Sequence, residues 1–274
     1  MVQPTTICGQ SARVYLEYNH ATDIPAREAG WTRFVCLSDT HSATHWDNGG
    51  RMPRGDVLLH AGDLSSWGTV QKLKKTVDWL GNLEGYATKI FIGGNHDLWL
   101  DNQCEEMNLF DEEERETMLK TCQRLMAKPR LKQLGLTYLE FEETRIRESG
   151  IAKEWRVFGS PASPRHSSGA FQYGTKEARE INSRIPADTE ILLTHTPPYK
   201  TLDKTRKGIY AGCKSLEKRL ISEDLRHCRL HVFGHIHEAA GAEIIEAGQG
   251  RVERVAVNAA MIHRGKPIVV DLRN

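Results

Sequence analysis

Residues 33–41 read RFVCLSDTH, a short apolar run that stops at an aspartate and a histidine two positions apart. Two further runs end in the same way, since residues 56–63 read DVLLHAGD and residues 88–97 read TKIFIGGNHD. Short apolar runs that stop at glycine and polar residues are typical of buried strands. We therefore expect three strands, each of which ends in a loop that carries chemically competent side chains.

A helix is expected between the second and third of these strands. Val70, Leu73, Val77 and Leu80 recur at intervals of three or four residues, which is the spacing of one helical face. The order strand, helix, strand predicts parallel pairing through a right-handed crossover. A second helix is expected within residues 101–127, where a run of acidic residues precedes apolar residues at helical spacing.

The second half of the chain changes character, because short strands and turns replace the longer helical patterns. Strands are expected at residues 136–139, 144–147, 155–159, 190–194, 229–233, 242–245, 254–257 and 267–272. Many strands with few helices indicate a second sheet packed on the first. Residues 1–30 are polar and aperiodic except for a weak alternation at 13–18. We therefore predict a loosely attached N-terminal arm, followed by a single domain over residues 31–274.

The overall composition excludes several classes of protein. The 274 residues include 37 basic and 36 acidic residues, so the formal net charge of +1 argues against a nucleic-acid coat or a membrane-surface anchor. No apolar stretch approaches the roughly 18 residues that span a bilayer, and no signal peptide is apparent, so we expect a cytoplasmic protein. The six cysteines contain no Cys-x-x-Cys pair, which excludes a zinc ribbon and favours reduced thiols.

Five polar motifs follow the ends of apolar runs. They are Asp39-x-His41, Gly62-Asp63, Gly94-Asn95-His96-Asp97, His195 and Gly234-His235-Ile236-His237. Loops at the carboxyl ends of strands converge in an α/β sheet, so these distant residues can meet. A donor set of two carboxylates, one amide oxygen and four imidazoles suits Mn²⁺, Fe, Zn²⁺ or Mg²⁺. Its members are Asp39, Asp63, Asn95, His41, His195, His235 and His237.

Seven ligands are too many for one ion and suit two ions if one carboxylate bridges them. Asp63 is the natural bridge because it lies in the shortest and most constrained loop. Two ions about 3.5–4 Å apart would share a hydroxide formed at neutral pH and clamp the oxygens of an in-line displacement at phosphorus. The expected reaction is therefore phosphoester hydrolysis.

The ordered set of motifs resembles the calcineurin-like metallophosphoesterase superfamily. Residues 35–42, 60–63, 193–198 and 231–238 are similar to its MPPED-type branch, which is related to the class III cyclic nucleotide phosphodiesterases. Residues 210–213, 257–259 and 268–272 extend the similarity over about residues 33–272. The resemblance implies an α/β fold, a four-layer αββα sandwich of two mixed sheets flanked by helices, with a binuclear metal site at the strand carboxyl ends.

The resemblance also implies a role for each site residue. One metal ion would be held by Asp39, His41, Asp63 and His237, and the other by Asp63, Asn95, His195 and His235. His96 would contact the phosphoryl or leaving-group oxygen as a general acid or charge stabiliser, and Asp97 would orient it. Some branch members have glycine in place of His235, so its presence here implies an intact second metal site. Manganese is the expected metal, with iron, zinc or magnesium as alternatives.

The expected function is a metal-dependent phosphodiesterase that acts on small phosphodiesters, such as 2',3'- or 3',5'-cyclic nucleotides, by attack of a metal-bridging hydroxide. A phosphomonoesterase or protein phosphatase with the same centre is an alternative, and a non-catalytic interaction module is a third. The expected partner is a small phosphoester, rather than a membrane or a long nucleic acid, whose binding relies on many basic contacts. Nothing in the sequence indicates an oligomeric state.

Three groups of residues outside the motifs have two interpretations each. Residues 200–219 contain seven basic and two acidic residues, which either gather an anionic substrate or form a solvated surface. The aromatic residues near the predicted loops either stack on a nucleobase or pack in the core or rim; they are Trp46, Trp67, Trp99, Phe171 and Tyr173. The remaining central and C-terminal histidines are expected to be ordinary polar residues; they are His45, His60, His166, His227, His231 and His263.

Overall fold

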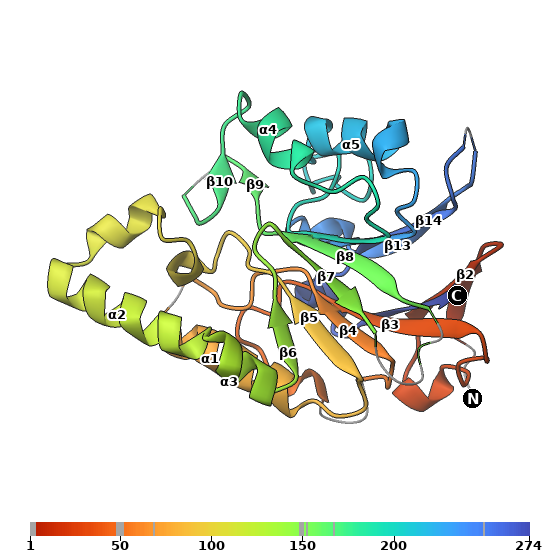
Figure 1. The fold of residues 1–274 in the computed structure, drawn as a ribbon, viewed down its shortest axis with the longest axis horizontal. Helices are drawn as coiled ribbons and strands as arrows, with labels where there is room; N and C mark the ends of the chain where they lie inside the picture. Colours follow the sequence, from red (N-terminus) through yellow and green to blue (C-terminus); the bar gives the residue numbers. More distant parts are fainter. Residues whose placement is uncertain are drawn as a thin grey trace.

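The computed structural model describes residues 4–47, 52–67, 69–147, 151, 153–166, 168–248 and 250–274. Two large mixed sheets pack face to face, and helices cover the outer face of each sheet (Figure 1). The layers therefore follow the order helix, sheet, sheet, helix, and the predicted α/β sandwich is confirmed.

The first sheet has the strand order β1-β2-β15-β3-β4-β5-β6. Its strands are β1 (Thr5–Cys8), β2 (Ala12–Glu17), β15 (Ile268–Arg273), β3 (Trp31–Leu37), β4 (Val57–His60), β5 (Thr88–Phe91) and β6 (Leu136–Tyr138). Strands β3 to β6 are parallel to one another, and helix α1 (Val70–Asn82) crosses over between β4 and β5 as the sequence predicts.

The second sheet has the strand order β13-β14-β12-β11-β8-β7. Its strands are β13 (Gly241–Ile245), β14 (Arg254–Asn258), β12 (Leu230–Phe233), β11 (Ile191–Thr194), β8 (Trp155–Ser160) and β7 (Glu142–Ile146). The four central strands are parallel, and a small pair, β9 (Ser163–Pro164) and β10 (Gln172–Tyr173), lies outside both sheets. Each sheet therefore has parallel strands whose carboxyl ends can present functional loops.

Helices α1, α2 (Glu112–Leu125) and α3 (Lys128–Gln133) lie on the first sheet, and α4 (Ala178–Ser183) and α5 (Lys214–Ile221) lie on the second (Figure 1). Shorter helices are α6 (Met261–Arg264) and the 3-10 turns Ala21–Asp23, His45–Asp47, Leu98–Leu100, Glu105–Leu109, Glu223–Leu225 and His237–Ala239. Helix α2 begins where the Asp111 carboxylate accepts a hydrogen bond from the Glu114 backbone N–H (2.8 Å). In the described part of the chain, no helix is both long and apolar enough to cross a bilayer.

The last four residues of β3, residues 34–37, are apolar without alternation. Phe34 and Cys36 face the core between the two sheets, whereas Val35 and Leu37 face the core beneath α1, and all four are fully buried. Successive side chains in a strand point to opposite faces, so a strand covered on both sides must be apolar throughout. This double burial holds the loop after β3 in a fixed place.

The N-terminal residues differ from the expected loose arm. Strands β1 and β2 extend the first sheet, and Val14 and Tyr15 in β2 are 0% and 3% exposed. The partner of β2 is β15, which was expected in the second sheet but lies between β2 and β3 in the first. Both differences have one cause. Strands β2 and β15 lie about 250 residues apart in the sequence, and a sequence pattern read over a few residues cannot show that they pair.

Candidate metal centre

The predicted ligands lie in five loops at the carboxyl ends of β3, β4, β5, β11 and β12. The loops after β3 and β4 are tied together, because the Asp39 N–H donates to Gly62 O (2.9 Å) and the His41 N–H donates to Asp63 O (3.0 Å). The Gly234 N–H donates to His195 O (3.0 Å), which joins the two loops of the second sheet. The parallel strands thus hold the loops in pairs before any ligand binds.

Several of these residues adopt the left-handed backbone conformation. The φ angles of Asp39, Asp63 and His235 are 52°, 54° and 68°. Residues other than glycine rarely adopt such angles, and they concentrate at functional sites where the surrounding structure holds them. Here the turn that ends each strand aims the side chain inward instead of along the sheet.

The first ligand group consists of Asp39, His41, Asp63 and His237, whose candidate ligand atoms all lie within 4.8 Å of one another. His237 Nε2 is 3.0 Å from Asp39 Oδ1 and 3.3 Å from His41 Nε2. A carboxylate and two imidazole nitrogens that converge in this way are a suitable ligand set for a divalent cation.

The second ligand group consists of Asn95, His195 and His235. Asn95 Oδ1 is 2.9 Å from His195 Nε2 and 2.8 Å from His235 Nδ1. His195 Nδ1 is 3.0 Å from the carbonyl of Ala61, so it carries the proton and leaves a lone pair on Nε2 when the ring is neutral. Burial lowers the pKa of His195, which favours that neutral ring. The lone pair on His195 Nε2 faces Asn95 Oδ1, and a cation could bind to both atoms.

Asp63 lies between the two groups. Its Oδ2 is 3.8 Å from His41 Nε2, and its Oδ1 is 3.4 Å from His195 Nε2, so each oxygen faces a different group. Burial raises the pKa of Asp63 well above its ordinary value, and the nearby carboxylates of Asp39 and Asp97 raise it further. Buried carboxylates without nearby positive charge are unfavourable, and divalent cations bound here would supply the positive charge that balances them.

Two motif glycines leave the space that the carboxylates occupy. A Cβ at Gly234 would lie 1.9 Å from Asp39 Oδ2, and a Cβ at Gly94 would lie 2.3 Å from Asp63 Oδ1. Neither contact is possible for real atoms. The glycines of the Gly-His-x-His and Gly-Asn-His-Asp motifs are therefore required by close packing against ligands.

We expect Gly234→Ala to displace Asp39, to weaken metal binding and to lower the free energy of unfolding by about 1–3 kcal/mol. Thermal unfolding with and without Mn²⁺, together with metal analysis, measures both effects. Gly248→Ala is the matched control, because a Cβ at Gly248 meets nothing within 4 Å. Equal metal content and stability in the two variants would contradict the packing argument.

Asp97 differs from its expected role of orienting His96. Its carboxylate accepts hydrogen bonds from the Leu64 N–H (3.1 Å), the Gly94 N–H (2.9 Å), and both the N–H and the hydroxyl of Ser65 (2.8 Å each). His96 Nδ1 is buried and has no hydrogen-bond partner among the described residues. Asp97 therefore braces the loop after β4 against the loop after β5, because its carboxylate turns toward the backbone instead of toward the imidazole.

His96 lies at the open side of the centre. Its backbone N–H donates to Asp63 Oδ1 (2.8 Å), and its ring centroid is 4.8 Å from that of His41. The Trp67 ring, 48% exposed as a residue, packs 4.3 Å from the His96 ring. Burial and the neighbouring imidazoles lower the pKa of His96 to about 3, so the free protein holds a neutral ring.

Two histidines that were expected to be ordinary polar residues, His166 and His263, lie beside candidate ligands. The His166 ring centroid is 4.9 Å from that of His235, and the His263 ring centroid is 5.8 Å from that of His237. Both residues are exposed. No motif or periodicity marks them, because only the fold brings the segment after β9 and helix α6 near the site.

Two other histidines behave as expected for polar core residues. His60 Nε2 is 3.0 Å from Thr40 Oγ1, and His231 Nε2 is 2.8 Å from Thr194 Oγ1. Both histidines are fully buried. Each threonine is the chain neighbour of a candidate ligand, so these hydrogen bonds steady the ligand loops from behind.

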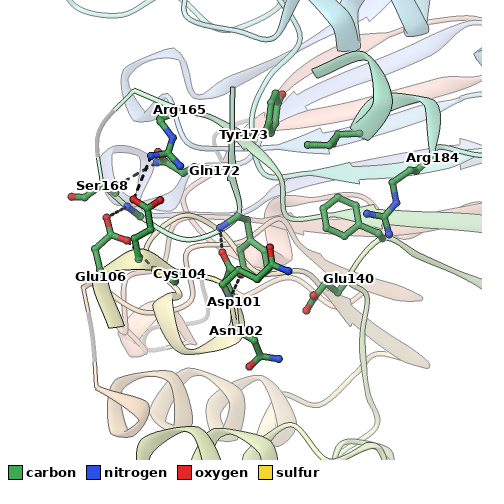
Figure 2. A pocket seen from close by; sticks show the side chains of 16 residues that line it. Asp101, Asn102, Cys104, Glu106, Glu140, Arg165, Ser168, Gln172, Tyr173 and Arg184 are labelled. Atoms are coloured by element: carbon green, nitrogen blue, oxygen red, sulfur yellow. Dashed lines mark hydrogen bonds and ion pairs between the residues drawn. The ribbon is translucent and has the colours of Figure 1, made fainter. Parts of the chain in front are cut away.

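A cavity of about 810 Å³ adjoins the centre but is lined by none of the seven candidate ligands. Figure 2 shows Asp101, Arg165 and Arg184 at its border. The segment that separates it from the ligands is joined to both sides, because the Ala170 N–H donates to Asn95 O (2.9 Å) and the Phe171 N–H donates to Asp101 Oδ2 (2.7 Å). This cavity is therefore a neighbour of the centre and not its mouth.

The model of the calcineurin-like phosphoesterase family matches residues 32–239, which include all seven candidate ligands as well as His96 and Asp97. The chain belongs to the calcineurin-like phosphoesterase family. The predicted resemblance is thereby confirmed, and membership supports a metal-dependent phosphoester hydrolase. The assignment of individual ligands to each metal ion stays a prediction.

Relatives of this phosphoesterase cover most of its length. Metallophosphoesterase domain-containing protein 1 of Homo sapiens is 34% identical in an alignment of 263 residues, which covers 89% of this chain and 72% of that protein. A probable rhamnogalacturonate lyase C of Emericella nidulans is 37% identical over 213 residues, but the chain spans only 18% of its length. One solved crystal structure has a TM-score of 0.53 at 13% identity, with 83% of this chain and 90% of that chain covered, and shows likeness of fold alone.

Proposed function

We propose that this phosphoesterase hydrolyses small phosphodiesters with two divalent ions, manganese first among them. The observation that carries the proposal is the Asp63 carboxylate, which is 1% exposed and has one oxygen toward each ligand group. Two ions held in this way would supply Lewis acidity toward the phosphoryl oxygens and lower the pKa of water so that hydroxide is available at neutral pH. The oxygen and nitrogen donor set, which contains no thiolate, supports manganese over softer metals.

His96 is the group that we propose to act on the substrate. It is half-buried beside His41, and among the described residues no hydrogen bond engages its ring, so the ring is available to hydrogen-bond with a bound phosphoester. A neutral imidazole carries one N–H, which can donate to a phosphoryl oxygen or to the oxygen of the leaving group. The backbone hydrogen bond from His96 to Asp63 fixes this donor relative to the proposed bridging carboxylate.

Trp67 supports a substrate that carries an aromatic group. Its side chain is exposed although it packs against His96, so an aromatic surface borders the proposed phosphoryl site. A nucleobase or aryl ester would pack there by stacking. We therefore propose nucleotide diesters, among them the 2',3'- and 3',5'-cyclic nucleotides, as the first substrates to test.

The test compares bis(p-nitrophenyl) phosphate with p-nitrophenyl phosphate, and the two kinds of cyclic nucleotide with each other. We expect faster turnover of the diester in Mn²⁺, loss of turnover after chelation, and recovery when Mn²⁺ is returned. Faster turnover of the monoester would replace the diesterase proposal with the phosphomonoesterase alternative. Absence of metal-dependent turnover of either compound would contradict enzymatic function altogether.

A further inference from the structure

A second cavity, of about 470 Å³, lies against the 3-10 turn that begins at the candidate ligand His237. Residues 238 and 239 of that turn form part of its wall, and Lys200, Lys204, Arg206 and Tyr210 form much of the rest. These cations belong to the basic stretch whose role the sequence leaves open. The fold thus places three of its positive charges in one hollow beside the metal centre.

Arg206 is positioned toward the metal centre by His263. Its Nη2 is 3.0 Å from His263 Nε2, and since a guanidinium only donates, that nitrogen accepts the hydrogen bond. The His263 ring in turn lies 5.8 Å from the His237 ring at an interplanar angle of 73°. The Arg206 backbone N–H also donates to Glu238 Oε1 (2.7 Å), which ties the loop to the residue that follows His237. The guanidinium is therefore held near the candidate ligand while other N–H donors remain for a bound anion.

The cations of this cavity lack acidic partners. Among the described residues, no carboxylate lies within 4.0 Å of the charged groups of Lys200, Lys204 or Arg206, whereas Arg219 of the same basic stretch pairs with Asp224 at 2.6 Å. The three cations outnumber the two carboxylates of the cavity wall, Asp203 and Glu238, so the cavity keeps a positive charge that favours an anion.

The two carboxylates in the cavity wall are engaged by backbone groups. Asp203 is 1% exposed, and its Oδ2 accepts hydrogen bonds from the N–H groups of Lys200 (3.0 Å) and Gly212 (2.8 Å). The Glu238 carboxylate accepts from the Arg206 N–H. Both acids therefore shape the loop, and the positive side chains remain for a ligand.

We propose that Arg206, with Lys200 and Lys204, forms a subsite that binds a second phosphate group of the substrate. His263 is a positioning residue, because it acts through Arg206. The planar guanidinium matches the oxygens of a phosphate, and Tyr210, 44% exposed, adds an aromatic surface beside it. This inference rests on the proposed function for the phosphoester that is cleaved, and it narrows the substrate to phosphoesters that carry another phosphate.

The experiment uses two chromogenic diesters that differ in one group, thymidine 5'-(p-nitrophenyl phosphate) with and without a 3'-phosphate. We expect the 3'-phosphate to lower KM about tenfold in the wild-type protein, through charge-assisted contacts with the exposed cations of the subsite. Arg206→Ala should bring the ratio of the two KM values close to one, and Arg206→Lys should keep part of it. Lys207→Ala, an exposed cation of the same loop outside the cavity wall, should keep all of it.

A binding measurement separates this inference from the proposed function. Calorimetry on the full chain after chelation compares thymidine 3',5'-bisphosphate with thymidine 5'-monophosphate. Tighter binding of the bisphosphate, lost in Arg206→Ala and kept in Lys207→Ala, would support the subsite even if neither diester is hydrolysed. Equal binding of the two nucleotides, or an equal loss of both in Arg206→Ala, would overturn it, as would KM values that do not depend on the 3'-phosphate.

Discussion

Asp63→Asn is expected to lower the metal content from about two equivalents to less than one and to abolish most of the turnover. Asparagine keeps the shape of the side chain but removes the charge that both ligand groups share, since the two carboxylate oxygens face His41 and His195 separately. Metal analysis of the purified protein measures the loss directly. Turnover of bis(p-nitrophenyl) phosphate in Mn²⁺ measures its consequence.

Two further variants show whether the loss is specific to a bridging position. Asp39→Asn should reduce the occupancy of one ion more than the other, because Asp39 belongs only to the group that contains His41 and His237. Asp78→Asn, on the surface of α1, should leave two full equivalents bound. Full metal content in Asp63→Asn, with a native unfolding transition, would contradict the bridging role.

His96→Ala should lower kcat by about 10²–10⁴ on a diester with a poor leaving group, which is the usual range for the loss of a general acid or base. Metal content should be nearly unchanged, because among the described residues His96 hydrogen-bonds to a candidate ligand through its backbone N–H, which the substitution keeps. Comparison of alkyl and p-nitrophenyl leaving groups identifies the role. A larger loss with the alkyl ester indicates proton donation to the leaving oxygen, and an equal loss indicates a contact with the phosphoryl group.

His45→Ala provides the control for this comparison. His45 is an exposed histidine that packs on Trp46, and it makes no contact with a candidate ligand among those found in the described residues. The kcat of the His45→Ala variant should equal that of the wild-type protein. Wild-type turnover in His96→Ala on both leaving groups would remove His96 from the reaction.

The candidate ligands could be recognised in the sequence because local chemistry and local structure coincide there. Asp39 and His41 follow a strand whose last four residues, 34–37, are all apolar, and burial on both faces of the strand explains that run. The glycines beside Asp63 and His235 mark turns that a Cβ would block. Constraints of this kind act over a few residues, so they leave a pattern that can be read along the chain.

Contacts between distant segments left no such pattern. The Asp97 carboxylate accepts hydrogen bonds from N–H groups of the loop after β4. The expectation that it contacts His96 rested only on the two residues being neighbours in the sequence. The attachment of the N-terminal residues to the first sheet was missed for the same reason, since β2 pairs with β15 from the other end of the chain.

The residues that follow the strand ends in the sequence therefore already indicated the donor set, the family and the class of reaction. Three features became visible only in the tertiary structure. They are the pairing of β15 with β2, the hydrogen bonds by which Asp97 braces two loops, and the placement of Arg206 and His263 near His237. The physical reason is that a ligand motif is held by its own strand and turn. The proposed subsite instead lies between segments that follow β11, β12 and β14, and only the pairing of these strands in the second sheet brings the segments together.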